Sequence, residues 1–235
     1  MENIKDDRGF NQVWVDSKST RIRAERRCDY IISQMAIDVS KSVLEIGCGR
    51  GNNSFMLAQK TGMKVLGTDL CVPFVEEAQQ NFQLPNLRYD IFDFNQATQF
   101  KGEKFDYIIG NGILHHLYHN LDEAFANMQQ LLKDAGKIIF LEPNIYNPYV
   151  YLIFSYPYLR QKARLEPDEM AFSKRHITEK LAKANYKNIK VEYKDFLLPG
   201  VPEVMISPSI LVGDLLEKIP LVNKIAQSIF IQATK

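Results

Sequence analysis

Residues 43–51 read Val-Leu-Glu-Ile-Gly-Cys-Gly-Arg-Gly, an apolar segment that runs directly into a glycine-rich turn. A buried strand that turns sharply into a helix needs residues that tolerate positive φ, and glycine tolerates it without steric cost. Glycine also leaves no side chain between the backbone and a ligand. In open α/β sheets, ligands bind beyond the carboxyl ends of the strands. This stretch therefore predicts the ligand-binding turn of a parallel sheet.

Strand-like and helix-like segments alternate on both sides of this turn. We expect helices over 18–38, 52–60, 75–82, 122–133 and 176–184, and strands over 42–46, 64–68, 87–92, 105–110, 137–141, 189–195 and 229–233. Gly136 is expected to end the helix over 122–133. Alternation at this spacing predicts βαβ units and an α/β fold with helices on both faces of the sheet.

Two acidic residues follow the next two expected strands. Asp69 ends the second strand, and Asp93 ends the third. A carboxylate about 20 residues beyond a glycine loop accepts hydrogen bonds from ribose hydroxyls. Since the carboxyl ends of parallel strands meet at one edge, the pattern predicts a nucleoside site with ribose on Asp69 and adenine near Asp93.

The loop itself favours a cofactor without phosphate. A dinucleotide fingerprint needs a third glycine where this chain has Asn52, and no Gly-Lys-Ser/Thr sequence follows the loop. Glu45, two residues before the first glycine, would repel a diphosphate and attract an ammonium or sulfonium group. A nicotinamide-dependent oxidoreductase is therefore the alternative, and a cationic nucleoside cofactor is the preferred interpretation.

At this point the sequence resembles the class I S-adenosylmethionine-dependent methyltransferases. Residues 44–51 resemble the first motif of that family, and 69–70 and 93–94 resemble its ribose and adenine sites. Residues 105–109 and 114–117 resemble its fourth-strand motif, and 131–137 resemble the turn before its fifth strand. The resemblance covers residues 40–145 in detail.

The resemblance implies a three-layer, doubly wound sheet of seven strands in the order 3-2-1-4-5-7-6, with strand 7 antiparallel. It implies S-adenosylmethionine as cofactor, with Glu45 near the methionine moiety and the residues ending the fourth strand beside the sulfonium. The cofactor-binding residues expected on this basis are Glu45, Gly47, Cys48, Gly49, Gly51, Asp69, Leu70, Asp93, Phe94, Asn111 and Gly112.

His115 and His116 are the candidate catalytic residues, because they follow the fourth strand, where an acceptor would approach. Methyl transfer needs a base only if the acceptor must lose a proton. The structural alternative is that both histidines cap the loop and pack under the cofactor. Neighbouring residues point apart on regular elements, so no metal site is expected here. His176 is a further candidate for acceptor contact, with an exposed helix start as the alternative.

The segment 1–40 is expected to form an N-terminal helical lid. Trp14 and Arg21 are candidates for covering the methionine carboxylate, and the alternative is a solvated basic face. Arg23 and Arg27 are expected to face water together with Arg21. Residues 41–145 are expected to form the cofactor-binding core and 146–235 the acceptor side, all within a single methyltransferase domain spanning 1–235.

Composition excludes several classes of protein. The chain has 235 residues, 29 Lys+Arg against 28 Asp+Glu, 46% hydrophobic and 24% charged residues. These values exclude intrinsic disorder and argue against nucleic-acid binding by bulk charge. Three cysteines without a C-x-x-C pair predict neither a disulfide framework nor a zinc ribbon, and they favour the reducing cytoplasm. The N-terminus has no leader pattern, and no apolar run is long enough to span a membrane.

Two segments stand outside the core pattern: the tyrosine-rich 145–165 and the proline-rich, amphipathic 197–225. They predict either core and dimer surface, or an apolar acceptor funnel with peripheral membrane contact. We expect a small-molecule or lipid-linked acceptor, such as a quinone precursor, a polyprenyl-linked sugar or a fatty acid. The chain is expected to be a monomer or homodimer, and a non-catalytic nucleoside-binding protein of the same fold remains the alternative from a different class.

Overall fold

The computed structural model describes residues 17–93, 102–198 and 200–235. Seven strands form one sheet in the order β3-β2-β1-β4-β5-β7-β6, and β7 runs antiparallel to both neighbours. The strands are β1 (Ser42–Ile46), β2 (Lys64–Asp69), β3 (Leu87–Ile91), β4 (Phe105–Asn111), β5 (Leu132–Pro143), β6 (Lys187–Lys194) and β7 (Ser228–Thr234). The strand order and the antiparallel last strand predicted from the sequence are therefore confirmed.

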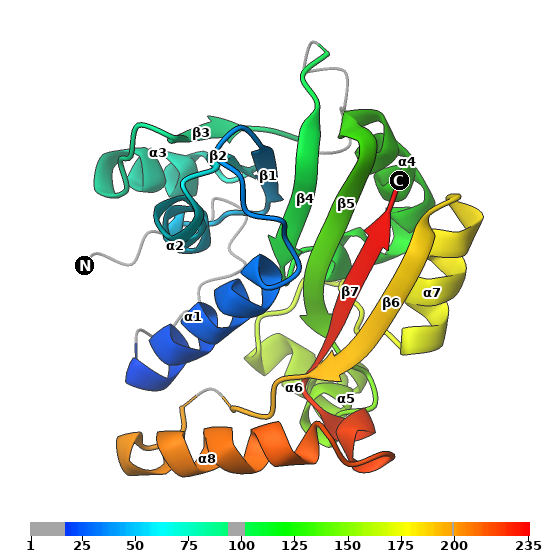
Figure 1. Ribbon diagram of the computed structural model, residues 1–235. Coiled ribbons are helices and arrows are strands. Elements are labelled where there is room, and N and C mark those ends of the chain that lie inside the picture. Colours follow the sequence, from blue (N-terminus) through cyan, green and yellow to red (C-terminus); the bar gives the residue numbers. More distant parts are fainter. Residues whose placement is uncertain (1–16, 94–101, 199) are drawn as a thin grey trace.

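Helices cover both faces of the sheet, giving three layers (Figure 1). They are α1 (Lys18–Ile32), α2 (Asn52–Thr61), α3 (Val72–Asn81), the 3-10 helix η2 (Leu114–Asn120), α4 (Leu121–Leu131), α5 (Pro148–Ser155), α6 (Pro157–Lys162), α7 (Lys174–Lys183), α8 (Glu203–Leu216) and the 3-10 helix η3 (Val222–Ile225). One face is packed by α4 and α7 around Phe125 and Leu181. The other is packed by α1 and α2 around Ile31 and Leu57.

The start of β5 differs from the sequence prediction. Helix α4 ends at Leu131 and the strand begins at the next residue, so Gly136 does not end a helix. The register between β4 and β5 shifts between Phe105 and Tyr107, which makes an irregular bulge in the strand. A Cβ atom on Gly136 would lie 2.9 Å from the carbonyl oxygen of Lys133, so a glycine is required by this close approach.

The carboxyl ends of β4 and β5 point towards α1, α5, α6 and α8, which gather beyond that end of the sheet (Figure 1). This arrangement places α1, α5, α6 and α8 over the edge where an α/β sheet binds ligands, whereas α7 packs on a face of the sheet and β6 is an edge strand. No helix within the described residues is long and apolar enough to cross a membrane.

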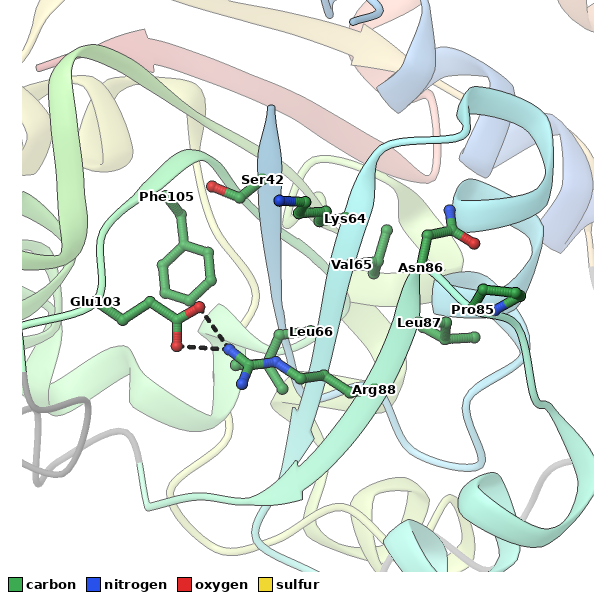
Figure 2. A pocket seen from close by; sticks show the side chains of 10 residues that line it. All are labelled: Ser42, Lys64, Val65, Leu66, Pro85, Asn86, Leu87, Arg88, Glu103 and Phe105. Atoms are coloured by element: carbon green, nitrogen blue, oxygen red, sulfur yellow. Dashed lines mark hydrogen bonds and ion pairs between the residues drawn. The ribbon is translucent and has the colours of Figure 1, made fainter. Parts of the chain in front are cut away.

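A cavity of about 260 Å³ lies at the opposite end of the sheet, among the first residues of β1, β2, β3 and β4. Figure 2 shows its lining, including the ion pair between Arg88 and Glu103. Because ligands of open α/β sheets bind at the carboxyl ends, this amino-end cavity is not a candidate for the cofactor or the acceptor.

Candidate functional site

The glycine loop between β1 and α2 has backbone angles that suit glycine, with φ of 69° at Gly47 and 52° at Gly49. A Cβ atom on Gly47 would lie 2.6 Å from the side chain of Ile113, whereas one on Gly49 would meet no atom within 4 Å. Gly47 is therefore required by packing against the segment after β4. Gly49 borders open space, so a ligand can approach the backbone there.

Three amide groups of this loop already donate hydrogen bonds within the protein. Cys48 N–H donates to the carbonyl oxygen of Thr68 at 2.9 Å, and Gly51 N–H donates to that of Cys48 at 3.0 Å. Gly49 N–H donates to Oδ2 of Asp69 at 2.8 Å. A diphosphate cradle needs several free amides pointing at the ligand. These three amides do not provide one, so the loop fits an adenosyl sulfonium compound better than a dinucleotide.

Asp69 stands at the end of β2 with its carboxylate fixed at both oxygens. Oδ1 accepts from Cys71 N–H at 2.9 Å, and Oδ2 accepts from Gly49. Each carboxylate oxygen has a further lone pair, so the group keeps the capacity to accept from two ribose hydroxyls. Leu70 beside it is 50% exposed and offers an apolar surface for a ring. Asp93 lies just after the neighbouring β3 and is half-buried, while Phe94 lies outside the described residues.

Glu45 lies beneath the loop and not on its surface, with only 1% of the residue exposed. It accepts hydrogen bonds from Asn53 Nδ2 at 2.6 Å and from the Ser54 hydroxyl, both on the first turn of α2. Burial raises the pKa of Glu45 to about 7, and the charge of Asp69 adds to the increase. Glu45 is thus placed to hold the start of α2 against β1, and the direct contact with a methionine moiety expected from the sequence has no exposed surface to use.

Asn111 and Gly112 end β4. The side-chain oxygen of Asn111 accepts from Arg27 Nη1 of α1 at 3.1 Å, and Gly112 N–H donates to the carbonyl of Leu141 on β5 at 2.8 Å. Gly112 lines a cavity of about 290 Å³, which we call the acceptor cavity. Its other lining residues are Arg23, Arg27, His115, Leu141, Glu142, Pro143, Tyr149, Val150, Ile153, Phe154, Gln227 and Ser228.

Arg23 and Arg27 face this cavity and not bulk water, which corrects the sequence expectation. Their side chains are 21% and 13% exposed, and both donate to Oδ2 of the buried Asp195, at 3.0 Å and 2.8 Å. Burial and the charge of Arg27 lower the pKa of Arg23 to about 10. The pKa of Asp195 is lowered, because the two guanidinium groups outweigh the effect of burial.

The two adjacent histidines converge, contrary to the expectation that they point apart. They lie on η2, where the imidazole rings have centroids 4.3 Å apart. His115 Nδ1 is 2.9 Å from Glu142 Oε2, and His116 Nδ1 is 3.1 Å from Glu169 Oε1. Burial opposes the charged form of His116, but the hydrogen bond to Glu169 and nearby carboxylate charges outweigh it and raise the pKa.

The remaining candidates lie away from the acceptor cavity or outside the description. His176 stacks on Tyr118 with centroids 5.0 Å apart and does not line the cavity. Its pKa is lowered by partial burial and by the charge of Lys180. Arg21 is exposed on α1, and Trp14 lies outside the described residues.

Sequence reasoning missed the carboxylates around the histidines. Glu142 ends β5, and its Oε1 accepts from Ile113 N–H at 2.9 Å and Leu114 N–H at 2.7 Å, so it fixes the start of η2. The sequence could have indicated Glu142, because it lies near the carboxyl end of a strand beside β4, where ligands of α/β sheets bind. Glu169 carries no such signal, because it lies in an irregular segment whose path depends on distant contacts.

Comparison with known proteins agrees with this geometry. Residues 43–136 match the family described as methyltransferase domain. An uncharacterized methyltransferase of Geobacillus kaustophilus is 33% identical over 115 residues, covering 48% of this chain and 52% of that protein. An S-adenosyl-L-methionine-dependent Diels-Alderase of Talaromyces variabilis is 28% identical over 117 residues, covering 48% of this chain and 39% of its own length. The chain thus spans about half or less of these relatives.

Solved structures share the fold over nearly the whole chain. A methyltransferase from Archaeoglobus fulgidus superposes with a TM-score of 0.65 at 19% identity, covering 92% of this chain and 94% of that one. A phosphoethanolamine N-methyltransferase of Haemonchus contortus with S-adenosyl-L-methionine gives 0.64 at 17% identity, covering 93% and 57%. The fold is that of the Rossmann-like methyltransferases. Residues 43–136 form a class I S-adenosylmethionine-dependent methyltransferase domain, and the cofactor of this class of domain is S-adenosylmethionine.

Proposed function

We propose that the chain transfers the methyl group of S-adenosylmethionine to a small acceptor bound in the acceptor cavity. One observation carries this proposal: the glycine loop and the acceptor cavity meet at the end of β4. Gly47 packs against Ile113, and Gly112, the preceding residue, lines the cavity. A cofactor over the loop would therefore direct its sulfonium towards the cavity, as an in-line displacement requires.

Each cofactor contact is part of this proposal. Asp69 accepts from the ribose hydroxyls, Asp93 binds the adenine amine, and Leu70 packs on the ring. Gly49 leaves room for the methionine moiety, while Asn111 and Gly112 lie near the sulfonium. Glu45 acts indirectly, through its hydrogen bonds to Asn53 and Ser54 at the start of α2. When bound, the cofactor supplies an electrophilic methyl group.

His115 is the residue placed to take a proton from the acceptor, because it lines the cavity. Its Nδ1 contacts Glu142, so Nε2 is the nitrogen left to act as a base. His116 is not among the lining residues of the cavity and contacts Glu169. We therefore assign His115 the catalytic role and His116 a positioning role.

The walls of the cavity favour an acceptor with an apolar body and a group that accepts hydrogen bonds. Val150, Ile153 and Phe154 form an apolar side. On the polar side lie the guanidinium of Arg23 and the buried Nε2 of Gln227, which has no hydrogen-bond partner within the described residues. A carboxylate, phosphate or carbonyl on the acceptor would satisfy these donors.

A lipid-linked acceptor is the finer version of this proposal. Helices α5, α6 and α8 lie beyond the same end of the sheet and expose several large apolar side chains (Figure 1). These include Tyr151, Tyr158, Val204, Leu211 and Leu215. Exposed apolar side chains on neighbouring helices are typical of contact with lipids or other proteins.

Calorimetry with S-adenosylhomocysteine tests the cofactor part. Asp69→Ala removes two hydroxyl contacts to a carboxylate, which should weaken binding by about 2–4 kcal/mol. Asp134→Ala is the matched control, since Asp134 is exposed near the amino end of β5. Equal affinity of the two variants, or tight binding of NAD, would contradict the assignment.

Transfer itself is tested with a radiolabelled methyl donor and a panel of apolar acids, quinone precursors and polyprenyl-linked sugars. The assay must detect the methylated product, because one relative's name couples S-adenosylmethionine dependence to a different reaction. Cofactor binding without any methylated product would favour the non-catalytic alternative.

A further inference from the structure

We propose that His115, His116 and Glu169 bind a divalent transition-metal ion of the zinc class at the side of the acceptor cavity. One donor atom from each of the three residues lies within 4.8 Å of the others. His115 also lines the acceptor cavity, so the ion would stand next to it. The binding of the ion does not depend on the proposed methyl transfer, whereas any contact between the ion and an acceptor does. With the ion bound, Nε2 of His115 is a ligand, so the proton-accepting role of His115 belongs to the metal-free chain.

The distances between the donor atoms suit a tetrahedral ion. Two ligands at zinc bond lengths of about 2.0–2.1 Å and a tetrahedral angle lie about 3.3 Å apart. In the structure, His116 Nδ1 is 3.1 Å from Glu169 Oε1, and His115 Nε2 is 3.8 Å from Glu169 Oε2. An ion can therefore enter by small side-chain adjustments, replacing the hydrogen bond between His116 and Glu169.

His115 is oriented as metal-binding histidines are. Its Nδ1 lies 2.9 Å from Glu142 Oε2, and Glu142 is itself fixed by the amides of Ile113 and Leu114. A carboxylate that accepts from one imidazole nitrogen sets the tautomer and directs the lone pair of the other nitrogen outward. Here that other nitrogen, Nε2, faces Glu169.

The segment that carries Glu169 is fixed by one arginine. Arg160 of α6 donates to the carbonyl oxygens of Phe154, Glu166 and Pro167, each at 2.8 Å, and to that of Glu169 at 3.0 Å. Glu169 is only 2% exposed, although it is an acid outside regular secondary structure. Buried acids are stable only when cationic or hydrogen-bonding groups surround them, and a divalent ion is such a group.

The donor set selects the class of ion. Two imidazoles and one carboxylate suit zinc, cobalt or iron, whereas magnesium and calcium prefer oxygen ligands alone. Glu166, whose Oε2 lies 3.7 Å from His116 Nδ1, is a further carboxylate within reach. Three protein ligands with a remaining open position are typical of sites where a metal contacts a substrate.

Titration of the chelator-treated chain with Co²⁺, followed by calorimetry and by the visible absorption of the bound ion, tests the proposal. We expect one saturable site with a spectrum of low-coordinate cobalt, and displacement of the cobalt by Zn²⁺. His116→Ala and Glu169→Gln should each lower the cobalt affinity at least about 10- to 100-fold. That loss is typical even for residues that only hydrogen-bond to a metal ligand, so loss of a ligand itself should cost no less. His119→Ala is the control, since His119 shares η2 but lies outside the cluster.

Circular dichroism and thermal unfolding of the metal-free variants check that each chain is folded, and Glu169→Gln preserves the size of the side chain. Equal cobalt affinities of the parent chain, His116→Ala and Glu169→Gln would overturn the proposal, as would an absence of saturable binding. Saturable cobalt binding by a parent chain that transfers no methyl group would contradict the proposed function without affecting the ion site.

Discussion

The cofactor edge, residues 42–69, and the acceptor side, residues 145–228, meet at one end of the sheet but are built differently. The cofactor edge is a local structure, in which β1, the glycine loop and Asp69 contact one another within about one βα unit. The acceptor side is assembled from distant segments, as when Arg23 and Arg27 of α1 meet Asp195. The comparison teaches that spacing along the chain determines the first region, whereas tertiary packing determines the second.

The largest effect is expected where the acceptor side depends on one buried carboxylate. Asp195→Asn removes the anion between two guanidinium groups and should lower the free energy of unfolding by about 3–5 kcal/mol, since it leaves uncompensated buried charge. Chemical denaturation measures this, and amide hydrogen exchange should show early opening of α1. Asp214→Asn breaks the exposed pair with Arg26 and should cost less than about 1 kcal/mol. Equal decreases in the free energy of unfolding of the two variants would show that the burial of Asp195 between two guanidinium groups adds nothing to stability.

Within the cofactor edge, Gly47 is required for packing, whereas Gly49 leaves space for a ligand. Gly47→Ala places a methyl group against Ile113 at positive φ, so the free energy of unfolding should fall by about 2–4 kcal/mol. Gly49→Ala meets open space and should cost only about 1–2 kcal/mol of backbone strain, yet weaken S-adenosylhomocysteine binding. Denaturant melts and calorimetry measure both. Identical stability losses would contradict the different surroundings of the two glycines.

The buried carboxyl group of Glu45, beneath the glycine loop, should make the stability of the chain depend on pH. Unfolded Glu45 loses its proton near pH 4.5, whereas the folded chain retains it up to about pH 7. The unfolded state thus binds fewer protons in this window, and the free energy of unfolding should fall by up to about 3 kcal/mol as the pH rises through it. Glu45→Gln should flatten this dependence. A melt series from pH 4.5 to 7.5 with the same slope in both chains would contradict the assignment.

The smallest effect on stability is expected at the exposed apolar surface of α8. Leu211→Ser and Leu215→Ser together should change the free energy of unfolding by less than about 1 kcal/mol, because both side chains are more than half exposed. If the acceptor is lipid-linked, the double variant should lose flotation with anionic liposomes. Unchanged flotation would show that this surface of α8 does not contact the membrane. The variant Thr178→Ala on α7 is the control for non-specific retention.

Much of the fold followed from local pattern. The glycine loop, the acids at the strand ends and the alternation of elements placed all seven strands within a few residues, apart from the early start of β5. That start was missed because a bulge depends on the neighbouring strand and leaves no periodic signal. The Asp69 position at the edge was foreseen for the same local reason.

The acceptor side could not be derived in this way. Arg23 and Arg27 point inward because they bind Asp195, roughly 170 residues further along the chain. A basic helix face has the same sequence pattern whether it faces water or a buried acid, so the pattern could not indicate this contact. The convergence of His115 and His116 likewise depends on Glu169, which comes from a segment without periodicity.

Arg160 fixes the irregular segment that carries two acids beside the histidines. Residues 166–169 belong to no helix or strand. The carbonyls of Glu166, Pro167 and Glu169 all accept from the guanidinium of Arg160, whose planar fork a lysine could not reproduce. Exchange of this arginine would release the backbone that holds Glu166 and Glu169 beside the two histidines. A side chain that does not line the acceptor cavity thus determines where two acids stand beside it.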